Sequence, residues 1–370
     1  MIYLDNAATT PPLEKAVDYA KKYIGEFYNP SALYSEGLEV SRFLKQVREK
    51  LVSYICPKGY ECIFTSGGSE SDNTAIFSSA RRGNAVTTAG EHSAVYEAVK
   101  SLEGKGVECR YAALNSDGSV CVADLLNKID EKTVFVSVVH VNNETGAIND
   151  INYIASEVKK KNPRVIFHSD GVQAYGKIPY RMSNAVDFYS ASAHKIGALK
   201  GCGILFKSPK ATLHPLIYGG GQEGGYRSGT ENVFGIAALH KASELKFSDI
   251  TVNFERVYVL KKRFNELLNF EKTLISTDSG SPYILTFAVR GVRGEILQHM
   301  LEKKDVIVGT GSACSSKSPY SRIIKACGYP GDLLNGVLRI SFSPENTIEE
   351  IETAAEKLNL AVSELKKIVR

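Results

Sequence analysis

The sequence lacks the marks of several protein classes. No apolar run approaches the roughly 20 residues that a helix needs to cross a bilayer. The first residues, Met1–Asp5, are not a basic stretch followed by an apolar one, so we do not expect secretion. The net charge is only +4 and the basic residues are dispersed, which predicts no nucleic-acid surface. We therefore expect a cytoplasmic protein that binds neither a membrane nor nucleic acid directly.

Cysteine is sparse and follows no pattern. The seven cysteines are an odd number, are scattered along 370 residues, and include no Cys-x-x-Cys pair. This argues against a disulfide framework and against a zinc site, and it fits a reducing compartment. Hydrophobic residues make up 43% and charged residues 23%, as in ordinary globular proteins, and the length is sufficient for two domains.

Apolar strands alternate with helical segments through the first two thirds of the chain. We predict strands at 62–65, 85–88, 133–139, 165–167 and 188–189, and a first helix after Pro12 with Val17, Ala20 and Ile24 on its apolar face. Such alternation indicates an α/β fold with a mostly parallel, doubly wound sheet. The composition shifts after a predicted helix at 233–246. We expect a large domain at 13–246 and a smaller one formed by 1–12 plus 247–370.

Polar side chains follow five of the predicted strands, at Ser66, His92, Asn143, Asp170 and Lys195. Ligands of parallel α/β sheets bind at the carboxyl ends of the strands. Each of these residues has an ordinary explanation as a cap or turn, and for an isolated His92 a helix cap is the better interpretation. Caps alone do not easily explain five such strand ends together, so the sequence predicts one shared site.

Asp170 and Lys195 together suit pyridoxal phosphate. A lysine binds the aldehyde of this cofactor as a Schiff base, and a carboxylate keeps its ring nitrogen protonated, so that the ring accepts electrons. For this pair alone, a capping lysine and a turn aspartate would be the better explanation, because both residue types are common at surfaces.

Two glycine-rich segments could bind a phosphate. Residues 66–69 follow a strand and precede a helix, whose apolar start we expect at Ala75. Backbone N–H groups and the helix dipole attract an anion at such a place. The segment lacks the Gly-Lys-Ser/Thr ending of a P-loop, and a simple cap is the alternative. Residues 219–230 are dense in glycine and include Arg227 and Thr230; the alternative is a flexible linker.

Cys314 differs from the other cysteines because it lies among small, polar, turn-forming residues at 309–319. A thiol on such a loop is accessible and can move, as a nucleophile that passes a group onward must. An incidental loop cysteine is an equally good explanation of this feature alone.

Taken together, these segments resemble the cysteine desulfurases, pyridoxal-phosphate enzymes of aminotransferase class V, nearly from end to end. The resemblance is carried by the segments at 3–10, 29–31, 65–70, 91–92, 141–144, 170–173, 192–195, 227–230, 311–316 and 339–341. It implies a PLP-dependent transferase of fold type I, with a large, mostly parallel sheet domain and a smaller α/β domain that carries the cysteine loop.

The resemblance also implies roles for single residues. Three residues would be catalytic. Lys195 would hold the cofactor and move the substrate's α-proton, Cys314 would attack the substrate sulfur and become a persulfide, and His92 would stack on the cofactor ring. Asn29, Asn143 and Arg339 would bind the substrate. The remaining cofactor contacts would come from Gly68, Ser69, His92, Asn143, Asp170, Gln173, Ser192, His194 and, across a homodimer, Thr230.

The departures from the family pattern keep the chemical groups. Ser69 stands where the family usually has threonine, Ala193 and Ser343 replace frequent glycines, and 197–201 reads Gly-Ala-Leu-Lys-Gly. We therefore predict a desulfurase that converts L-cysteine to L-alanine and passes sulfur to protein acceptors for iron–sulfur assembly or thiolation. The alternatives are a selenocysteine lyase, another class V lyase or transaminase, or a non-catalytic scaffold.

Overall fold

A computed structural model describes residues 1–311 and 320–368 of the chain. Cys314 lies outside these residues. The strands are β1 (Ile2–Leu4), β2 (Glu61–Thr65), β3 (Asn84–Thr88), β4 (Glu108–Ala112), β5 (Thr133–Ser137), β6 (Ile166–Asp170), β7 (Phe188–Ser192), β8 (Gly203–Lys207), β9 (Thr273–Leu274), β10 (Ile284–Ala288), β11 (Val306–Val308) and β12 (Val337–Ser341). The α-helices are α1 (Glu14–Gly25), α2 (Ser35–Ile55), α3 (Gly68–Ser79), α4 (Ser93–Glu103), α5 (Val122–Asn127), α6 (Ile151–Lys161), α7 (Val233–Ser248), α8 (Ile250–Leu267), α9 (Gly294–Glu302), α10 (Arg322–Ala326), α11 (Gly331–Leu334) and α12 (Ile348–Ile368).

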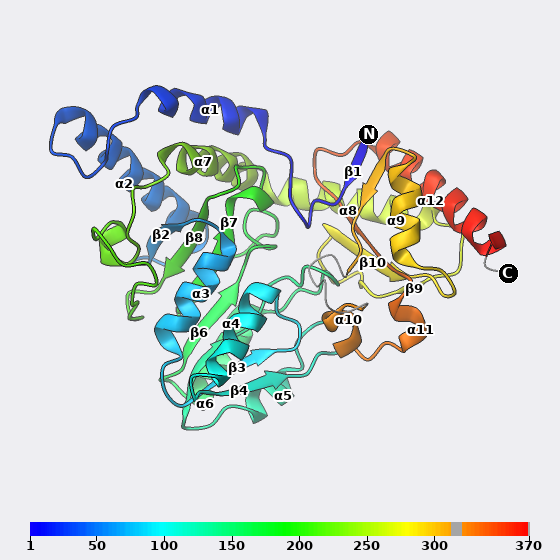
Figure 1. Ribbon diagram of the computed structural model, residues 1–370, viewed down its shortest axis with the longest axis horizontal. Helices are drawn as coiled ribbons and strands as arrows, with labels where there is room; N and C mark the ends of the chain where they lie inside the picture. Colours follow the sequence, from blue (N-terminus) through cyan, green and yellow to red (C-terminus); the bar gives the residue numbers. More distant parts are fainter. Residues whose placement is uncertain (312–319, 369–370) are drawn as a thin grey trace.

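The central sheet has the strand order β2-β8-β7-β6-β5-β3-β4 in the described part of the chain (Figure 1). Strands β4, β3, β5, β6 and β7 pair in parallel, and β8 runs antiparallel to both of its neighbours. All five residues of β7 and of β8 are buried, as expected for central strands covered on both faces. The predicted α/β fold with a mostly parallel sheet is confirmed.

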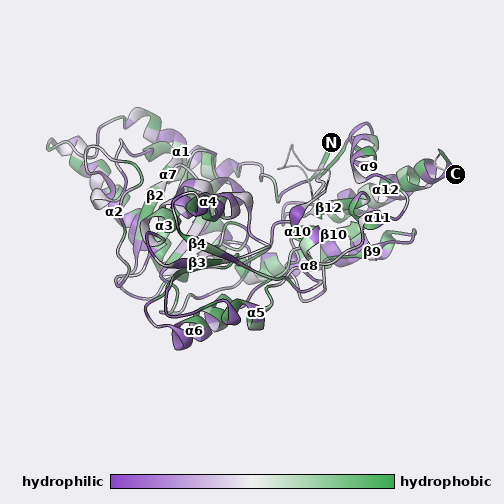
Figure 2. Cartoon of the chain, turned by 60° about the horizontal axis from the view of Figure 1, so that its bottom comes forward, coloured by the Kyte–Doolittle hydropathy of each residue, from purple (hydrophilic) through white to green (hydrophobic). Residues whose placement is uncertain are grey.

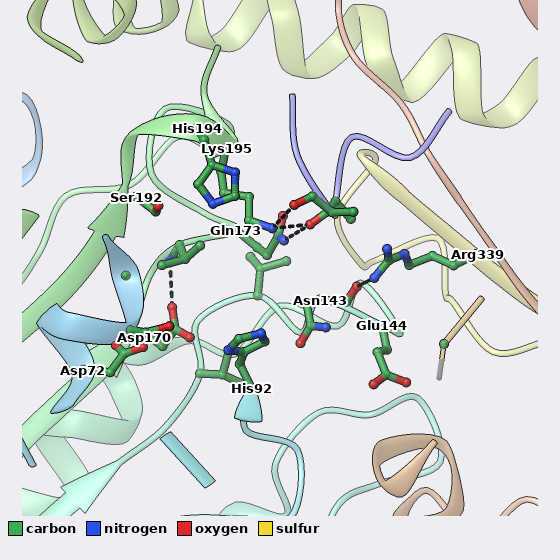
Figure 3. Close-up of a pocket in the computed structure, with 18 of the residues that line it drawn as sticks. Asp72, His92, Asn143, Glu144, Asp170, Gln173, Ser192, His194, Lys195 and Arg339 are labelled. Carbon is green, nitrogen blue, oxygen red and sulfur yellow. Dashed lines mark hydrogen bonds between the residues drawn. The ribbon is translucent and has the colours of Figure 1, made fainter. Parts of the chain in front are cut away.

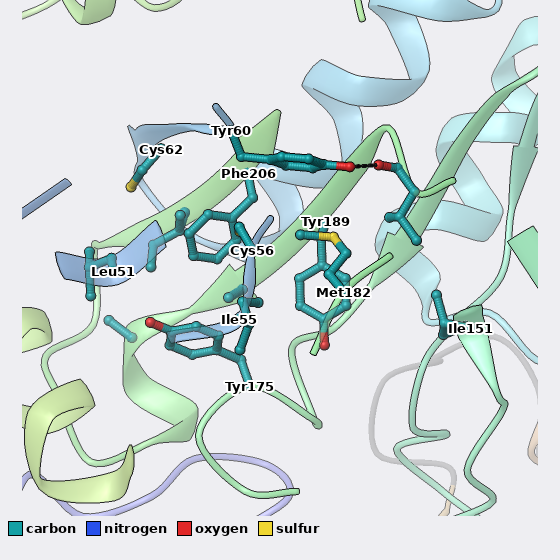
Figure 4. Packing of buried hydrophobic residues seen from close by; sticks show 14 of the residues in the cluster. Leu51, Ile55, Cys56, Tyr60, Cys62, Ile151, Tyr175, Met182, Tyr189 and Phe206 are labelled. Carbon is teal, nitrogen blue, oxygen red and sulfur yellow. Dashed lines mark hydrogen bonds between the residues drawn. The ribbon is translucent and has the colours of Figure 1, made fainter. Parts of the chain in front are cut away.

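Alternate residues of each strand face opposite sides of this sheet. In β2, Phe64 packs in a core with α1, α2, α6 and α7, while its neighbour Ile63 packs in a different cluster with Ala75 of α3. The larger core also contains Tyr60, whose hydroxyl donates to the Val186 carbonyl at 2.6 Å (Figure 4). The period of two in the strands thus supports helices on both faces, which is the doubly wound arrangement.

A second core is built from the chain ends. The pair β1–β11 and the sheet β12-β10-β9 pack with α8, α9 and α12 around Leu4, Phe264, Phe287 and Phe342. Helix α12 has polar and apolar residues along its length (Figure 2), and the apolar ones face this core. Thr347 and Glu350 exchange two hydrogen bonds of 3.1 Å at the start of α12 and so form a capping box.

Three local expectations were wrong. The helix expected from Ala75 begins at Gly68, so the Gly/Ser turn is itself the first part of α3. Ile24 was expected on the apolar face of α1 but is exposed; Tyr23 is buried there in its place. Strand β6 does not end with the apolar run at 165–167 but continues through Asp170, because β7 pairs with its polar residues.

Candidate active site

A cavity of about 300 Å³ opens at the carboxyl ends of β5, β6 and β7, where side chains from distant parts of the sequence meet (Figure 3). The strand-end residues His92, Asn143, Asp170 and Lys195 all line it, which confirms the predicted convergence. Ser66 does not, but its neighbours Gly68 and Ser69 do. Among the described residues, the lining consists of Ala7, Ala8, Gly68, Ser69, Asp72, His92, Val139, Val141, Asn143, Glu144, Asp170, Val172, Gln173, Ser192, His194, Lys195, Thr310, Gly311 and Arg339.

Asp170 forms the floor of the cavity. Its Oδ1 accepts a hydrogen bond from the backbone N–H of Val172 at 2.9 Å, and the side chain is almost completely buried. No lysine or arginine pairs with it among residues 1–311 and 320–368. Burial, followed by the nearby Asp72 carboxyl, raises the pKa of Asp170 to about 6. The site therefore holds a buried carboxyl group that a cationic ring nitrogen would match.

Lys195 lies opposite, on the short turn that follows β7. Its Nζ donates to the carbonyl oxygens of Ala7 at 2.6 Å and Ala8 at 2.7 Å. The Ala7 oxygen also accepts from Gln173 Nε2 at 2.8 Å. The N-terminal segment thus brings Lys195 and Gln173 together at one wall of the cavity.

The start of helix α3 supplies the anion-binding end. The first N–H groups of a helix have no intrahelical acceptor and carry the positive end of its dipole. Only glycine fits at position 68, because a Cβ there would lie 2.7 Å from Val172 Cγ2. Ser192 and His194 line the same cavity. Burial, then the charge of Lys195, lowers the pKa of His194 to about 4, so this side chain is a neutral donor or acceptor.

His92 serves both of the roles that the sequence allowed. Its Nδ1 accepts a hydrogen bond from the backbone N–H of Ala94 at 3.2 Å, which caps helix α4, and its ring lines the cavity. Burial lowers its pKa below the ordinary value. The neutral ring therefore carries its proton at Nε2.

Arg339 of β12 lies on the side of the cavity away from Asp170 (Figure 3). It donates from Nη2 to Asp5 Oδ1 at 2.8 Å and from Nη1 to the Asn143 carbonyl at 2.9 Å. Its buried Nε has no hydrogen-bond partner in the described part of the chain, and neither has the buried Oδ1 of Asn143. A buried guanidinium N–H without an acceptor suits a ligand carboxylate.

Two acidic residues of the cavity were not found by sequence reasoning. Asp72 of α3 is completely buried, and burial raises its pKa to about 7. Glu144 accepts a hydrogen bond from the Ser321 hydroxyl, and burial raises its pKa to about 7. Glu144 directly follows Asn143 at a predicted strand end, which was a usable signal. Asp72 gave none, because α3 was expected to start after it.

Two predicted site residues lie elsewhere. Asn29 and Thr230 are exposed and do not line the cavity of their own chain. Two ion pairs hold the glycine-rich loop with Thr230 against neighbouring helices. Arg48 Nη2 donates to Glu223 Oε1 at 2.6 Å, and Arg227 Nε donates to Glu70 Oε1 at 2.9 Å. The alternative of a flexible linker is therefore wrong.

The donor set fits pyridoxal phosphate. A carboxyl group without a cationic partner in the described chain, an amine at the opposite wall and a helix start match its ring nitrogen, aldehyde and phosphate, respectively. The fold and the site together define a PLP-type α/β enzyme, with its lysine directly after a strand of the sheet.

The chain belongs to the aminotransferase class-V family, whose family model matches residues 2–353. It is 36% identical to a "NifS/IcsS protein homolog" of Lactobacillus delbrueckii subsp. bulgaricus, over 95% of this chain and 94% of that one. It is 35% identical to a "Cysteine desulfurase IscS" of Methanosarcina thermophila, over 99% and 93% of the two chains.

Solved structures agree with this assignment. A "NIFS-LIKE PROTEIN" superposes with a TM-score of 0.92 at 31% identity, covering 98% of this chain and all of the other. "SspA in complex with cysteine" superposes with a TM-score of 0.81 at 25% identity, over 94% and 100% of the two chains.

No helix in the described part of the chain is long and apolar enough to span a membrane.

Proposed function

We propose that this protein is a pyridoxal-phosphate-dependent cysteine desulfurase, which converts L-cysteine to L-alanine and keeps the sulfur as an enzyme persulfide. The observation that carries the proposal is the meeting of Lys195, Asp170 and Arg339 at one cavity. Full-length relatives named cysteine desulfurase support it.

The cofactor supplies an electron sink that stabilises a negative charge at the substrate's Cα. Asp170 would hold the ring nitrogen in its protonated form, and His92 would cover the ring. Gln173 would donate to the ring oxygen. Gly68, Ser69, Ser192 and His194 would bind the phosphate, and Asn143 faces the same cavity.

Arg339 would bind the substrate carboxylate through its unpaired Nε–H, with Asn143 beside it. Lys195 Nζ would then take the proton from Cα. The Cys314 thiolate would attack the substrate sulfur: a new S–S bond forms, the C–S bond breaks, and its electron pair stays on carbon, which gains a proton. Cysteine and the Cys314 thiol thus give alanine and a Cys314 persulfide, with no external oxidant or reductant.

We also propose a homodimer in which Thr230 reaches the phosphate site of the partner subunit. Asn29 and Thr230 are both exposed, and large apolar side chains close to them in sequence are exposed as well. These side chains are Phe27, Leu33, Tyr34, Leu216, Ile217 and Tyr218. Exposed apolar residues in such number are typical of a protein interface. Asn29 stays a predicted substrate contact within this dimer.

The chain divides, in this proposal, into a large domain at 13–246 and a small domain of 1–12 plus 247–370. The two largest apolar clusters support this division, since one spans Ala16–Ala242 and the other joins Leu4 and Ala7 to 257–365. The described cysteines are all free thiols, which supports a cytoplasmic location. The sulfur acceptors would be proteins, such as an iron–sulfur scaffold or a thiolation enzyme.

The test uses Cys314→Ser. A serine hydroxyl stays protonated at neutral pH and is a poor nucleophile toward sulfur, so this variant should bind cofactor and L-cysteine, seen as spectral changes, but release no alanine. Peptide mass spectrometry of the cysteine-treated wild type should find one added sulfur atom on Cys314. Full alanine release by the variant would refute the persulfide mechanism. Activity kept only on selenocysteine would favour a lyase.

A further inference from the structure

A second lysine is buried behind the proposed cofactor site. Lys177 is 6% exposed, and no carboxylate pairs with it in the described part of the chain. Its Nζ donates to Gln173 Oε1 at 2.9 Å, and the ring of Tyr283 lies 5.8 Å away. Burial, then the charges of Lys195, Lys246 and Arg339, lowers the pKa of Lys177 well below its ordinary value. Burying an amine without a carboxylate partner costs free energy, which its hydrogen bond to Gln173 offsets in part.

Two contacts, one with Ala7 and one with Lys177, together fix which end of the Gln173 amide faces which neighbour. The carbonyl of Ala7 can only accept, so the amide nitrogen, 2.8 Å away, must point toward it. The amide oxygen then faces Lys177, whose amine donates in either protonation state. Gln173 lines the cavity, and the second N–H of its amide group remains for a ligand.

We propose that Lys177 is a positioning residue that holds the Gln173 amide with an N–H, and not a carbonyl, toward the cavity. The inference rests on the proposed function, because the ligand group it serves is the anionic ring oxygen of pyridoxal phosphate. The same Ala7 carbonyl accepts from Lys195 Nζ, so one chain of hydrogen bonds links Lys177, Gln173 and Lys195. Lys177 acts through Gln173 and does not itself line the cavity.

The protein contains a matched control. Lys261 is also buried, at 7% exposure, but its Nζ donates to the backbone carbonyls of Thr277 and Ser281, each at 3.2 Å. Neither Thr277 nor Ser281 lines the cavity. Removing the Lys261 amine therefore shows how much the loss of any buried amine changes cofactor affinity.

The experiment is a double-mutant cycle on cofactor affinity. Pyridoxal phosphate is titrated into cofactor-free wild type, Lys177→Met, Gln173→Ala and the double variant, and the dissociation constant is read from absorbance. We expect Lys177→Met to weaken binding about tenfold, since an oriented hydrogen bond to a charged oxygen is lost. When Gln173 is already alanine, adding Lys177→Met should change the dissociation constant less than about twofold. Lys261→Met should leave the constant within about twofold of wild type.

Several outcomes would overturn the inference. Equal weakening by Lys177→Met in both backgrounds means that Lys177 does not act through Gln173, and no weakening in either means that it has no positioning role. Failure of the wild type to bind pyridoxal phosphate would refute the proposed function as well. If the wild type binds pyridoxal phosphate normally but the effects of Lys177→Met and Gln173→Ala simply add, only this inference is refuted and the proposed function is not.

Gln173→Glu tests the same contact if Lys177→Met does not fold. Its carboxylate has no N–H to offer the cofactor, but it gives Lys177 a counter-ion. The cofactor-free variant should therefore melt at a higher temperature than Gln173→Ala, while binding pyridoxal phosphate no better. A melting temperature at or below that of Gln173→Ala, or tighter cofactor binding, contradicts the assignment.

Discussion

Arg339 on β12 donates from Nη2 to Oδ1 of Asp5 at 2.8 Å, which joins residues 334 positions apart in the sequence. Both side chains are largely buried, and Arg339 faces the cavity. The aspartate holds the guanidinium in one orientation, so that its unpaired Nε stays directed to one place.

Asp5→Ala should weaken substrate binding. Without its partner the guanidinium can turn away from the substrate carboxylate, and we expect the KM for L-cysteine to rise about tenfold while kcat changes less. Steady-state alanine release measures both constants. Asp18→Ala, which removes an exposed aspartate from α1, is the control. An unchanged KM would show that Asp5 does not orient Arg339.

Lys195→Ala should abolish the visible absorbance of lysine-bound cofactor. No other lysine lines the cavity in the described part of the chain, and Lys177 is separated from it by Gln173. Lys200→Ala removes an exposed lysine five residues away and should keep the band. A band that survives dialysis in Lys195→Ala, with turnover of cysteine, would contradict the role of Lys195.

Asp170→Asn should bind the cofactor through the phosphate end but turn over cysteine about 100-fold more slowly. An amide cannot keep the ring nitrogen protonated, so the charge at Cα is poorly stabilised. Alanine release at saturating cysteine, with the cofactor content measured separately, distinguishes lost chemistry from lost binding. Turnover within about threefold of wild type would mean that another group supports the ring.

Asp72→Asn should stabilise the cofactor-free protein increasingly as the pH rises. The pKa of Asp72 is about 7 in the folded chain and 3.8 ordinarily, so folding favours its protonated form. The contribution of protonated Asp72 to the free energy of unfolding is complete below about pH 4 and is lost as the pH rises through 7. Between pH 5 and pH 7.5 the variant should gain about 2 kcal/mol relative to wild type in urea unfolding. An exposed control, Asp18→Asn, should show no such gain. If the difference in free energy of unfolding between Asp72→Asn and wild type does not change with pH, the expectation is contradicted.

Glu223→Ala should destabilise the protein by about 3 kcal/mol, because it leaves Arg48 without its carboxylate in a largely buried site. Glu223 also has a φ of 53°, in the left-handed region that favours glycine. Glu223→Gly should therefore lose about 1 kcal/mol less than Glu223→Ala. Chemical denaturation compares the two. Equal losses would show that the backbone at 223 is not strained.

The parallel sheet and the meeting of strand ends could be predicted because both depend on short-range patterns. The apolar runs of β5, β6 and β7 mark strands, and the polar residues that follow them mark one edge of a sheet. Asp170 and Lys195 could be placed at the same edge of the sheet for this reason.

Contacts that join distant segments could not be predicted. Nothing near Ala7 in the sequence indicates that its carbonyl accepts from both Lys195 and Gln173, since this depends on how the first ten residues cross the sheet. The start of α3 was misplaced because serine and glycine favour caps and turns, whereas the helix includes both Gly68 and Ser69.

The pairing of β1 with β11 has a consequence for how the protein is made. Ile2 is in register with Val306, so the first strand leaves the ribosome long before its partner does. At about 5–20 residues per second, the wait lasts roughly 15–60 s. During translation the segment with Ala7 and Ala8 has no strand to hold it against Lys195, and the cavity is completed only when nearly the whole chain has emerged. We therefore expect pyridoxal phosphate to bind only to the finished polypeptide.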